Sequence, residues 1–151
     1  MGSGKGKIRR AQSGVMTQEV GMKTLVLGPE RKEWHTDGKP WGLLHREDGP
    51  AVEYEDGGKE WWQYGKLHRE DGPAKDHANG MKVWCINDKL HREDGPAFES
   101  SEGMKVWYIN DMKHRMDGPA VVNADGSEEW WLNNERVDEE TVKKFAVGKT
   151  Q

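Results

Sequence analysis

Aromatic and apolar residues recur along this chain at a fixed interval of 23 residues. Around each of Trp61, Trp84, Trp107 and Trp130 the same alternation of apolar and polar positions returns. An alternating segment after each Gly-Pro, such as residues 51–54, is typical of a half-buried β-strand. A second alternating segment contains the tryptophan, at residues 59–63, 82–86, 105–109 and 128–132. The pattern predicts a series of antiparallel β-hairpins.

Turn-forming residues separate the predicted strands at matching places. The two strands of each hairpin are joined at Asp56-Gly57-Gly58, Asn79-Gly80, Glu102-Gly103 and Asp125-Gly126. Glycine adopts the positive φ that tight hairpin turns require. Each second strand ends at Tyr64-Gly65, Asn87-Asp88, Asn110-Asp111 or Asn133-Asn134. Because most of these residues tolerate left-handed conformations, the chain is expected to turn again there.

The tryptophans set the predicted register of the sheet. By the two-residue period of a strand, Ile86 and Ile109 lie on the same side as the tryptophan two residues before them. The residue after each tryptophan faces the other side. We favour a structural spine for these aromatic rows, with an interaction face as the alternative. The candidate interaction face comprises Trp61, Trp84, Trp107, Trp130, Trp62, Tyr108 and Trp131.

A seven-residue motif, His-Arg-x-Asp-Gly-Pro-Ala, begins at residues 45, 68, 91 and 114. A fixed period of this size indicates a repeat architecture. The residues assigned to the motif are His45, Arg46, Asp48, Gly49, Pro50, His68, Arg69, Asp71, His91, Arg92, Asp94, His114, Arg115 and Asp117.

Histidine, arginine and aspartate together invite a catalytic interpretation. Catalysis requires groups that converge in one pocket, whereas the repeat spreads this trio along the chain. We therefore favour a structural role, in which the aspartate accepts backbone N–H bonds within its turn. The arginine and histidine are then expected to pair with carboxylates of the adjacent repeat. The sequence predicts no catalytic residue, no metal site and no cofactor.

The segments on either side of the repeats differ from them. Residues 22–27 are expected to form a first strand, and residues 34–41 resemble a shortened repeat, as terminal repeats often are. Near the C-terminus Asp138 is a predicted helix N-cap, with Val142 and Phe145 on one face. The predicted organisation is an N-terminal arm at residues 1–21, a β-repeat domain at 22–137 (a degenerate unit at 22–44, then full units from 45, 68, 91 and 114) and a helical cap and tail at 138–151.

Composition and charge refine this picture. Hydrophobic residues make up 33% of the chain and charged residues another 33%, values that alone would suggest disorder. Eight tryptophans, four of them in register with the repeat, favour instead an elongated β structure in which a few large side chains supply most of the buried area.

The N-terminal segment is basic and the rest of the chain is acidic. Residues 1–24 hold five basic residues and one acidic residue, a net charge of +4, which leaves −8 for the remainder because the whole chain carries −4. The basic arm includes Lys5, Lys7, Arg9 and Arg10. We expect it to be dispensable for folding and to contact an acidic protein surface or nucleic acid.

Cys85 is the only cysteine, so no disulfide can form within the chain. No apolar run approaches the length needed to span a bilayer, and the start of the sequence lacks the apolar segment of a signal peptide. These features predict a cytoplasmic protein without membrane insertion.

The pattern Trp-x-x-x-Gly-Lys-x-His-Arg-x-Asp-Gly-Pro-Ala resembles MORN-type repeats, which are β-hairpins of about this length. More closely it resembles the His-Arg-x-Asp-Gly-Pro-Ala repeat proteins of bacteriophages and some bacteria. The resemblance covers about residues 33–137. It departs from ordinary MORN repeats in carrying His-Arg-x-Asp where those have a glycine-rich segment, and it implies no catalytic residues.

These observations lead to an expected function without enzymatic activity. The first expectation is a phage accessory protein, acting in the infected host cell on a host or phage protein, for example as a defence inhibitor. The second is a structural component of the virion, with the basic arm docked on capsid, tail or DNA, or a homo-oligomeric assembly. The third is a binder of a small ligand or nucleotide on the tryptophan face.

Overall fold

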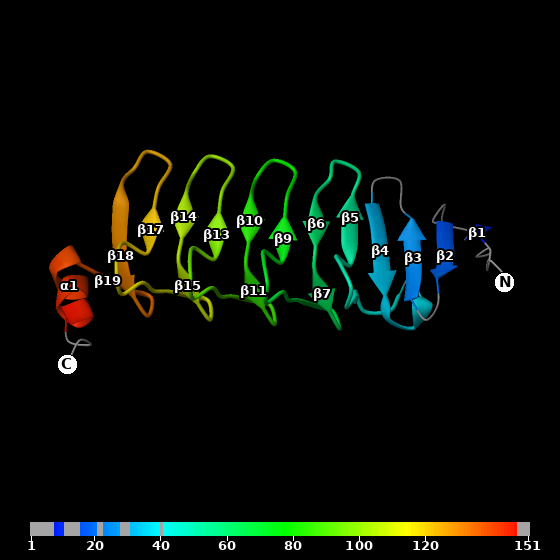
Figure 1. Ribbon diagram of the computed structural model, residues 1–151, viewed down its shortest axis with the longest axis horizontal. Coiled ribbons are helices and arrows are strands. Elements are labelled where there is room, and N and C mark those ends of the chain that lie inside the picture. Colours follow the sequence, from blue (N-terminus) through cyan, green and yellow to red (C-terminus); the bar gives the residue numbers. More distant parts are fainter. Residues whose placement is uncertain (1–7, 11–15, 21–22, 28–30, 40, 148–151) are drawn as a thin grey trace. The chain divides into compact units, whose positions relative to one another are not determined.

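A computed structural model describes residues 8–10, 16–20, 23–27, 31–39 and 41–147 of the chain. The chain divides into two compact units, Met1–His68 and Arg69–Gln151, and each unit is described by itself. In both units, the paired strands are antiparallel, and the main run of the second unit passes over the strands of small separate hairpins (Figure 1). The described residues are mostly β, with one short helix near the C-terminus. The predicted antiparallel β-meander with a C-terminal helix is thus confirmed at this level.

The first unit contains a run of antiparallel strands and one small additional hairpin. The run consists of β1 (Ile8–Arg10), β2 (Met16–Val20), β3 (Lys23–Leu27), β4 (Arg31–His35), β5 (Val52–Tyr54) and β6 (Lys59–Glu60). The hairpin pairs β7 (Trp62–Gln63) with β8 (Lys66–Leu67). A short 3-10 turn, η1 (Thr36–Gly38), follows β4. The strand predicted at residues 22–27 is confirmed as β3.

Two of these strands correct the interpretation of residues 1–21 as an arm. β1 pairs with β2 over three residue pairs, and β2 pairs with β3 over five. The segment lacks the tryptophan and glycine signals of the repeats, but a strand needs only a partner edge whose backbone groups are open. β3 supplies that edge. The expected arm is therefore wrong for Ile8–Arg10 and Met16–Val20, and the other residues of the segment lie outside the described residues.

The second unit repeats one arrangement. Its main run consists of β9 (Lys75–Asp76), β10 (Lys82–Val83), β13 (Phe98–Glu99), β14 (Lys105–Val106), β17 (Val121–Val122), β18 (Glu128–Leu132) and β19 (Glu135–Val137). Two small hairpins accompany it: β11 (Cys85–Ile86) with β12 (Lys89–Leu90), and β15 (Tyr108–Ile109) with β16 (Met112–Lys113).

Both sets of predicted turns are confirmed. Gly57, Gly80, Gly103 and Gly126 all have positive φ, between 83° and 96°. At the second set, both residues of each pair are left-handed, as Asn110 (φ 50°) and Asp111 (φ 66°) illustrate. Two consecutive left-handed residues form the type I′ turn that joins two-residue hairpins. These turns lead into β8, β12, β16 and β19, four strands that the hydrophobic pattern did not predict.

The predicted second strands are divided at their tryptophans, except at Glu128–Leu132. In the second unit the Trp84 N–H donates to the Ala97 carbonyl at 2.8 Å, while the Trp84 carbonyl accepts from the His91 N–H at 3.2 Å. The backbone of one tryptophan therefore holds both ends of the segment from His91 to Ala97. Trp107 holds Ala120 and His114 in the same way. The strand pairing is interrupted at Trp84 because the chain opposite it leaves the sheet as a loop at His91 and returns to the sheet at Ala97.

The core is small. The motif alanines Ala51, Ala74, Ala97 and Ala120 are fully buried, together with a few residues such as Val106 and Val121. The tryptophans of the repeats are only partly buried. An alanine at the end of each motif lets the chain approach the tryptophan backbone closely, as in the 2.8 Å bond from the Trp84 N–H to the Ala97 carbonyl.

The helix α1 (Glu139–Val147) ends the described chain and packs near β18. The Asp138 carboxylate accepts from the Thr141 N–H at 2.7 Å, which confirms the predicted N-cap. Val142 is 1% exposed and Phe145 is 56% exposed, so only the first of the two residues predicted on one face is buried. Among the described residues, no helix has the length and hydropathy that crossing a membrane requires.

Candidate functional site

The motif residues form a loop that its own arginine holds together. We call the segments 45–51, 68–74, 91–97 and 114–120 the motif loops. In the third, Arg92 Nε donates to Asp94 Oδ1 at 2.8 Å and Arg92 Nη1 donates to the Pro96 carbonyl at 3.3 Å. The same two bonds occur in the other three loops, at 2.7–3.3 Å. The expected pairing of the arginine with the adjacent repeat is thus corrected, whereas Asp71 and Asp94 do accept a backbone N–H within their loops, as expected. The arginine and aspartate pair within one loop.

The arginine also stacks on a tryptophan. The guanidinium carbon of Arg92 lies 4.2 Å from the centre of the Trp84 ring, and that of Arg115 lies 4.1 Å from Trp107. In the first unit the guanidinium carbon of Arg46 lies 4.2 Å from the centre of the Trp34 ring, so Trp34 has the same role in its motif loop as Trp84 and Trp107 have in theirs. A guanidinium over an indole face adds a cation–π attraction to its hydrogen bonds.

The motif glycine leaves room for that guanidinium. A Cβ atom at Gly95 would lie 2.7 Å from the guanidinium carbon of Arg92, and the other motif glycines show the same approach at 2.8–3.0 Å. Any larger residue would displace the arginine. The motif thus requires glycine for space, since its φ lies outside the left-handed region.

The motif histidine links its loop to the next hairpin. His91 Nδ1 accepts from the Asn110 N–H at 3.3 Å, and His114 Nδ1 accepts from the Asn133 N–H at 3.2 Å. In the first unit His45 accepts likewise from Tyr64, whose ring stacks on it at 4.0 Å. These contacts fix the orientation of each imidazole ring relative to the turn that follows its motif loop.

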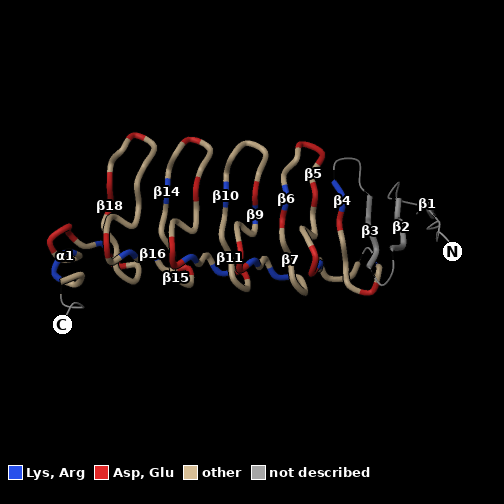
Figure 2. The backbone as a smooth tube through the Cα atoms, viewed as in Figure 1, with Lys and Arg blue, Asp and Glu red and all other residues tan. Residues whose placement is uncertain are grey.

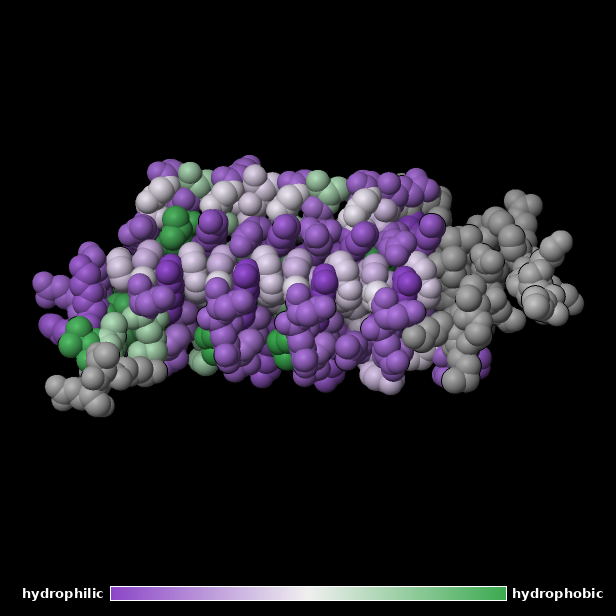
Figure 3. Space-filling model, viewed as in Figure 1, coloured by the Kyte–Doolittle hydropathy of each residue, from purple (hydrophilic) through white to green (hydrophobic). Residues whose placement is uncertain are grey.

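Successive motif loops of the second unit enclose two equivalent grooves. The first has a volume of about 590 Å³ and the second about 550 Å³. Trp84 and Ile86 line the first, and Trp107 and Ile109 occupy the same positions of the second. Figure 3 shows hydrophilic ridges with hydrophobic atoms between them in the region that carries β11 and β15. Each groove thus has an apolar floor between two polar walls.

Acidic side chains outnumber basic ones in both grooves. The first is lined by Arg69 and Arg92 and by four carboxylates: Glu70, Asp71, Glu93 and Asp94. The second has two arginines and three carboxylates, because Met116 stands where the other motifs have glutamate. Along the backbone, acidic and basic positions alternate near β11 and β15 (Figure 2). A hydrogen bond from the neighbouring arginine lowers the pKa of Asp71 and of Asp94, so both are ionised at neutral pH.

The structure brings only some of the predicted interaction face into these grooves. Trp84 and Trp107 line them, but Tyr108 and Trp131 do not. Trp131 donates its indole N–H to Glu129 at 2.9 Å, and Lys113 lies over its ring at 4.5 Å. The variable position of the motif also lines the grooves, which was not predicted from the sequence. Its signal is the recurrence of glutamate there in three of the four motifs.

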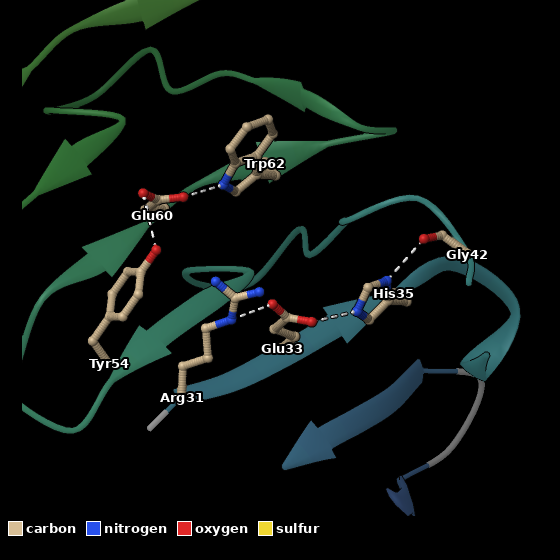
Figure 4. Close-up of polar contacts among 7 residues, drawn as sticks. All are labelled: Arg31, Glu33, His35, Gly42, Tyr54, Glu60 and Trp62. Carbon is tan, nitrogen blue, oxygen red and sulfur yellow. Dashed lines mark hydrogen bonds and ion pairs between the residues drawn. The ribbon is translucent and has the colours of Figure 1, made fainter. Parts of the chain in front are cut away.

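A second polar cluster lies in the first unit (Figure 4). The buried Glu60 carboxylate accepts from the Tyr54 hydroxyl at 3.3 Å and from the Trp62 indole at 2.8 Å. Burial, and then the charge of Glu60, raises the pKa of Tyr54. The cluster satisfies a buried charge and thus has a structural explanation.

Beside it, His35 is bonded through both ring nitrogens. Its Nδ1 lies 2.8 Å from the Gly42 carbonyl and its Nε2 lies 3.1 Å from Glu33, which also pairs with Arg31. The ring therefore ties β4 to the turn at Gly42 through one nitrogen and to a carboxylate of the same strand through the other.

Other predicted site residues belong to the N-terminal segment and to β18. Lys5 and Lys7 lie outside the described residues, and Arg9 and Arg10 belong to β1. Trp130 begins the part of β18 that pairs with β19, with Val137 opposite it. Within the described part of the chain, no three His, Cys, Asp or Glu side chains are grouped so that they could hold a metal ion. Comparisons with known protein families, curated proteins and solved structures gave no match to this chain.

Proposed function

We propose that this chain is a non-enzymatic interaction protein that binds a segment of another protein along the grooves between its motif loops. The observation that carries the proposal is the pair of grooves in the second unit, built from the same motif positions one repeat apart. Equivalent sites in series suit a partner that is itself extended. Two weak contacts on one connected ligand then act together, because binding at the first raises the local concentration at the second.

The use made of the motif side chains supports binding rather than chemistry. The arginine is occupied by an aspartate, a backbone carbonyl and a tryptophan ring. One nitrogen of His91 is occupied by a backbone N–H. An acid–base or nucleophilic site needs such groups directed at a common substrate position. Here they hold the loops that form the groove walls.

The proposal includes the architecture of the whole chain. The 23-residue spacing and the resemblance to MORN-type repeats support an elongated array of MORN-like hairpins, ended by α1. Small-angle scattering in solution tests this point. A maximum dimension typical of a globular protein of the same mass would contradict it.

The binding proposal is tested by reversing one charge that both grooves share. Glu93 lines both grooves, so Glu93→Arg alters the wall of each. Glu102→Arg is the matched control, because Glu102 is an exposed residue in the turn between β13 and β14 and lines neither groove. In affinity purification from the source cells, a partner should be lost with Glu93→Arg and retained with Glu102→Arg. Retention with both variants would contradict the proposal.

The resemblance to phage repeat proteins supports an accessory role in an infected cell, on a host or phage protein. The alternative, a virion component, is favoured by the basic character of residues 1–24, which suits a contact with DNA or with an acidic capsid surface. Mass spectrometry of purified particles distinguishes the two. Recovery of the chain in stoichiometric amounts would favour the virion.

A further inference from the structure

In both grooves the acidic side chains are more exposed to solvent than the arginines with which they pair. The Asp94 side chain is 85% exposed, whereas its partner Arg92 is 24% exposed, and the Arg69–Asp71 and Arg115–Asp117 pairs show the same difference. Each arginine is turned into its loop, where it meets a carbonyl group. The carboxylates are turned outward. A ligand that enters a groove therefore meets negative charge at the rim, and the nearest positive charge is already paired.

The floor of each groove adds an apolar requirement. Trp84 and Ile86 lie below the acidic rim of the first groove, and Trp107 and Ile109 lie below that of the second. Lysine and arginine carry an aliphatic stem with a cation at its end, so they can cover apolar surface while the charge stays in a polar environment. A basic side chain thus matches the floor with its stem and the rim with its charge.

The spacing of the grooves limits the conformation of the ligand. Each repeat adds two strands to the antiparallel run of the second unit. Neighbouring strands are about 4.8 Å apart, so equivalent grooves recur at about 10 Å. A polyproline II helix rises about 3.1 Å per residue with three residues per turn, and therefore presents one side chain on the same face about every 9.3 Å. A β-strand would place the third residue along on the opposite face.

We infer that the grooves between the motif loops bind a basic segment of a partner protein in the polyproline II conformation, with lysine or arginine at every third position. The inference rests on the proposed function and names the chemistry of its partner. Charge complementarity at the rim, an apolar floor and the match of the two periods each support it independently.

Two peptides of identical composition test whether the ligand needs a basic residue at every third position. One is four repeats of Lys-Pro-Pro, and the other has four consecutive lysines followed by eight prolines. Binding to the full-length chain is measured by titration calorimetry at 0.15 M salt, where screening over about 8 Å is shorter than the groove spacing. The periodic peptide should bind about fivefold or more tightly than the block peptide. Equal affinities, or no binding of the periodic peptide at millimolar concentration, would overturn the inference.

Three variants test whether the periodic peptide binds in the grooves. Glu93→Gln removes one carboxylate from both grooves and should weaken the periodic peptide about two- to fivefold, the range typical of one exposed ion pair. Met116→Glu restores the glutamate that the fourth motif lacks and should tighten binding by a similar factor. Glu102→Gln should have no effect. The melting temperature of each variant shows that it is folded, and equal effects of Glu93→Gln and Glu102→Gln would place the binding elsewhere.

These outcomes separate the inference from the function on which it rests. If the periodic peptide does not bind but a natural partner is still lost with Glu93→Arg, the binding function stands and the basic polyproline II ligand is ruled out. A natural partner that ignores Glu93→Arg would contradict the binding function itself.

Discussion

At the scale of single residues, the motif arginine determines the shape of each motif loop. Arg92 joins the carboxylate of Asp94, the carbonyl of Pro96 and the ring of Trp84, and its guanidinium packs against Gly95. The order Arg-x-Asp-Gly-Pro follows from this geometry. The aspartate and proline supply acceptors, and the glycine supplies space. The variable position makes none of these contacts, which explains why glutamate and methionine both occur there.

We predict that Gly95→Ala destabilises the protein by about 1–3 kcal/mol, the usual cost of forcing an extra methyl group into a packed site. The new Cβ atom would lie 2.7 Å from the guanidinium carbon of Arg92. Urea unfolding measures the loss. In an Arg92→Ala background the same substitution should cost less than about 0.5 kcal/mol, because the obstructing group is gone. Equal costs in both backgrounds would show that the arginine is not the obstruction.

Cys85 provides a second test at this scale. Burial, and then the negative charge of Asp111, raises the pKa of its thiol to about 11. The thiolate is the reactive form, so the folded protein should react with iodoacetamide at pH 8 about a hundredfold more slowly than the urea-unfolded protein. Mass spectrometry follows the reaction at this single cysteine. Equal rates in the two states would contradict the burial of Cys85.

At the scale of elements, the small hairpins depend on two consecutive left-handed residues. Three of the four turns begin with asparagine, which tolerates this conformation, and the first begins with Tyr64 at φ 49°. A tyrosine there is unfavourable by itself. Its ring stacks on His45, and its N–H donates to the same histidine, so local contacts compensate for part of the cost.

A matched pair of substitutions isolates the backbone requirement of these turns. Asn110→Ala and Asn110→Gly both remove the side chain, but only glycine adopts φ 50° without a Cβ clash. We expect the alanine variant to be less stable by about 1 kcal/mol in denaturant unfolding. Glu102 has no positive φ, so at that position alanine should be the more stable of the two. The same order at both positions would argue against the type I′ turn.

The hydrophobic pattern predicted most strands and all the recurring turns, because strand alternation and turn chemistry are local properties. It did not predict the division at the tryptophans. Residues 82–86 alternate like one strand, and whether Trp84 bonds to one partner strand or to both ends of a loop depends on residues seven to thirteen positions away. The strand β2 was missed for a related reason. Its pairing with β3 is visible only once the edge of β3 is known to be open.

The candidate site was predicted less completely than the fold. The motif residues were recognised as structural, but the assumed pairing of arginine with the adjacent repeat was wrong. The grooves arise between two loops 23 residues apart, so no local window contains them. Trp84 and Ile86 were assigned to one face by strand periodicity, yet the acidic rim above them required the tertiary structure.

At the scale of the whole molecule, the N-terminal strands change the expected result of truncation. Removing residues 1–20 deletes β1 and β2 and exposes the edge of β3, which otherwise forms five residue pairs with β2. We predict a melting temperature lower by several degrees, because about 1 kcal/mol corresponds to roughly 2–4 °C at this chain length. Removal of residues 1–10 deletes only the three pairs of β1 and should cost less.

Thermal unfolding followed by circular dichroism measures both truncations, and light scattering detects association through the exposed edge. An unchanged melting temperature after removal of residues 1–20 would support the original interpretation of this segment as a dispensable arm.

The attachment of each motif loop to a single tryptophan backbone has an evolutionary consequence. A one-residue insertion in a strand reverses the facing of every later side chain, but both ends of a motif loop are fixed at the same point of the neighbouring strand. The residue at the variable position can therefore be exchanged without shifting the pairing on either side. A lineage can thus change the charge of one motif loop at a time, as Met116 shows in the fourth motif, while the sheet that carries the loops stays the same.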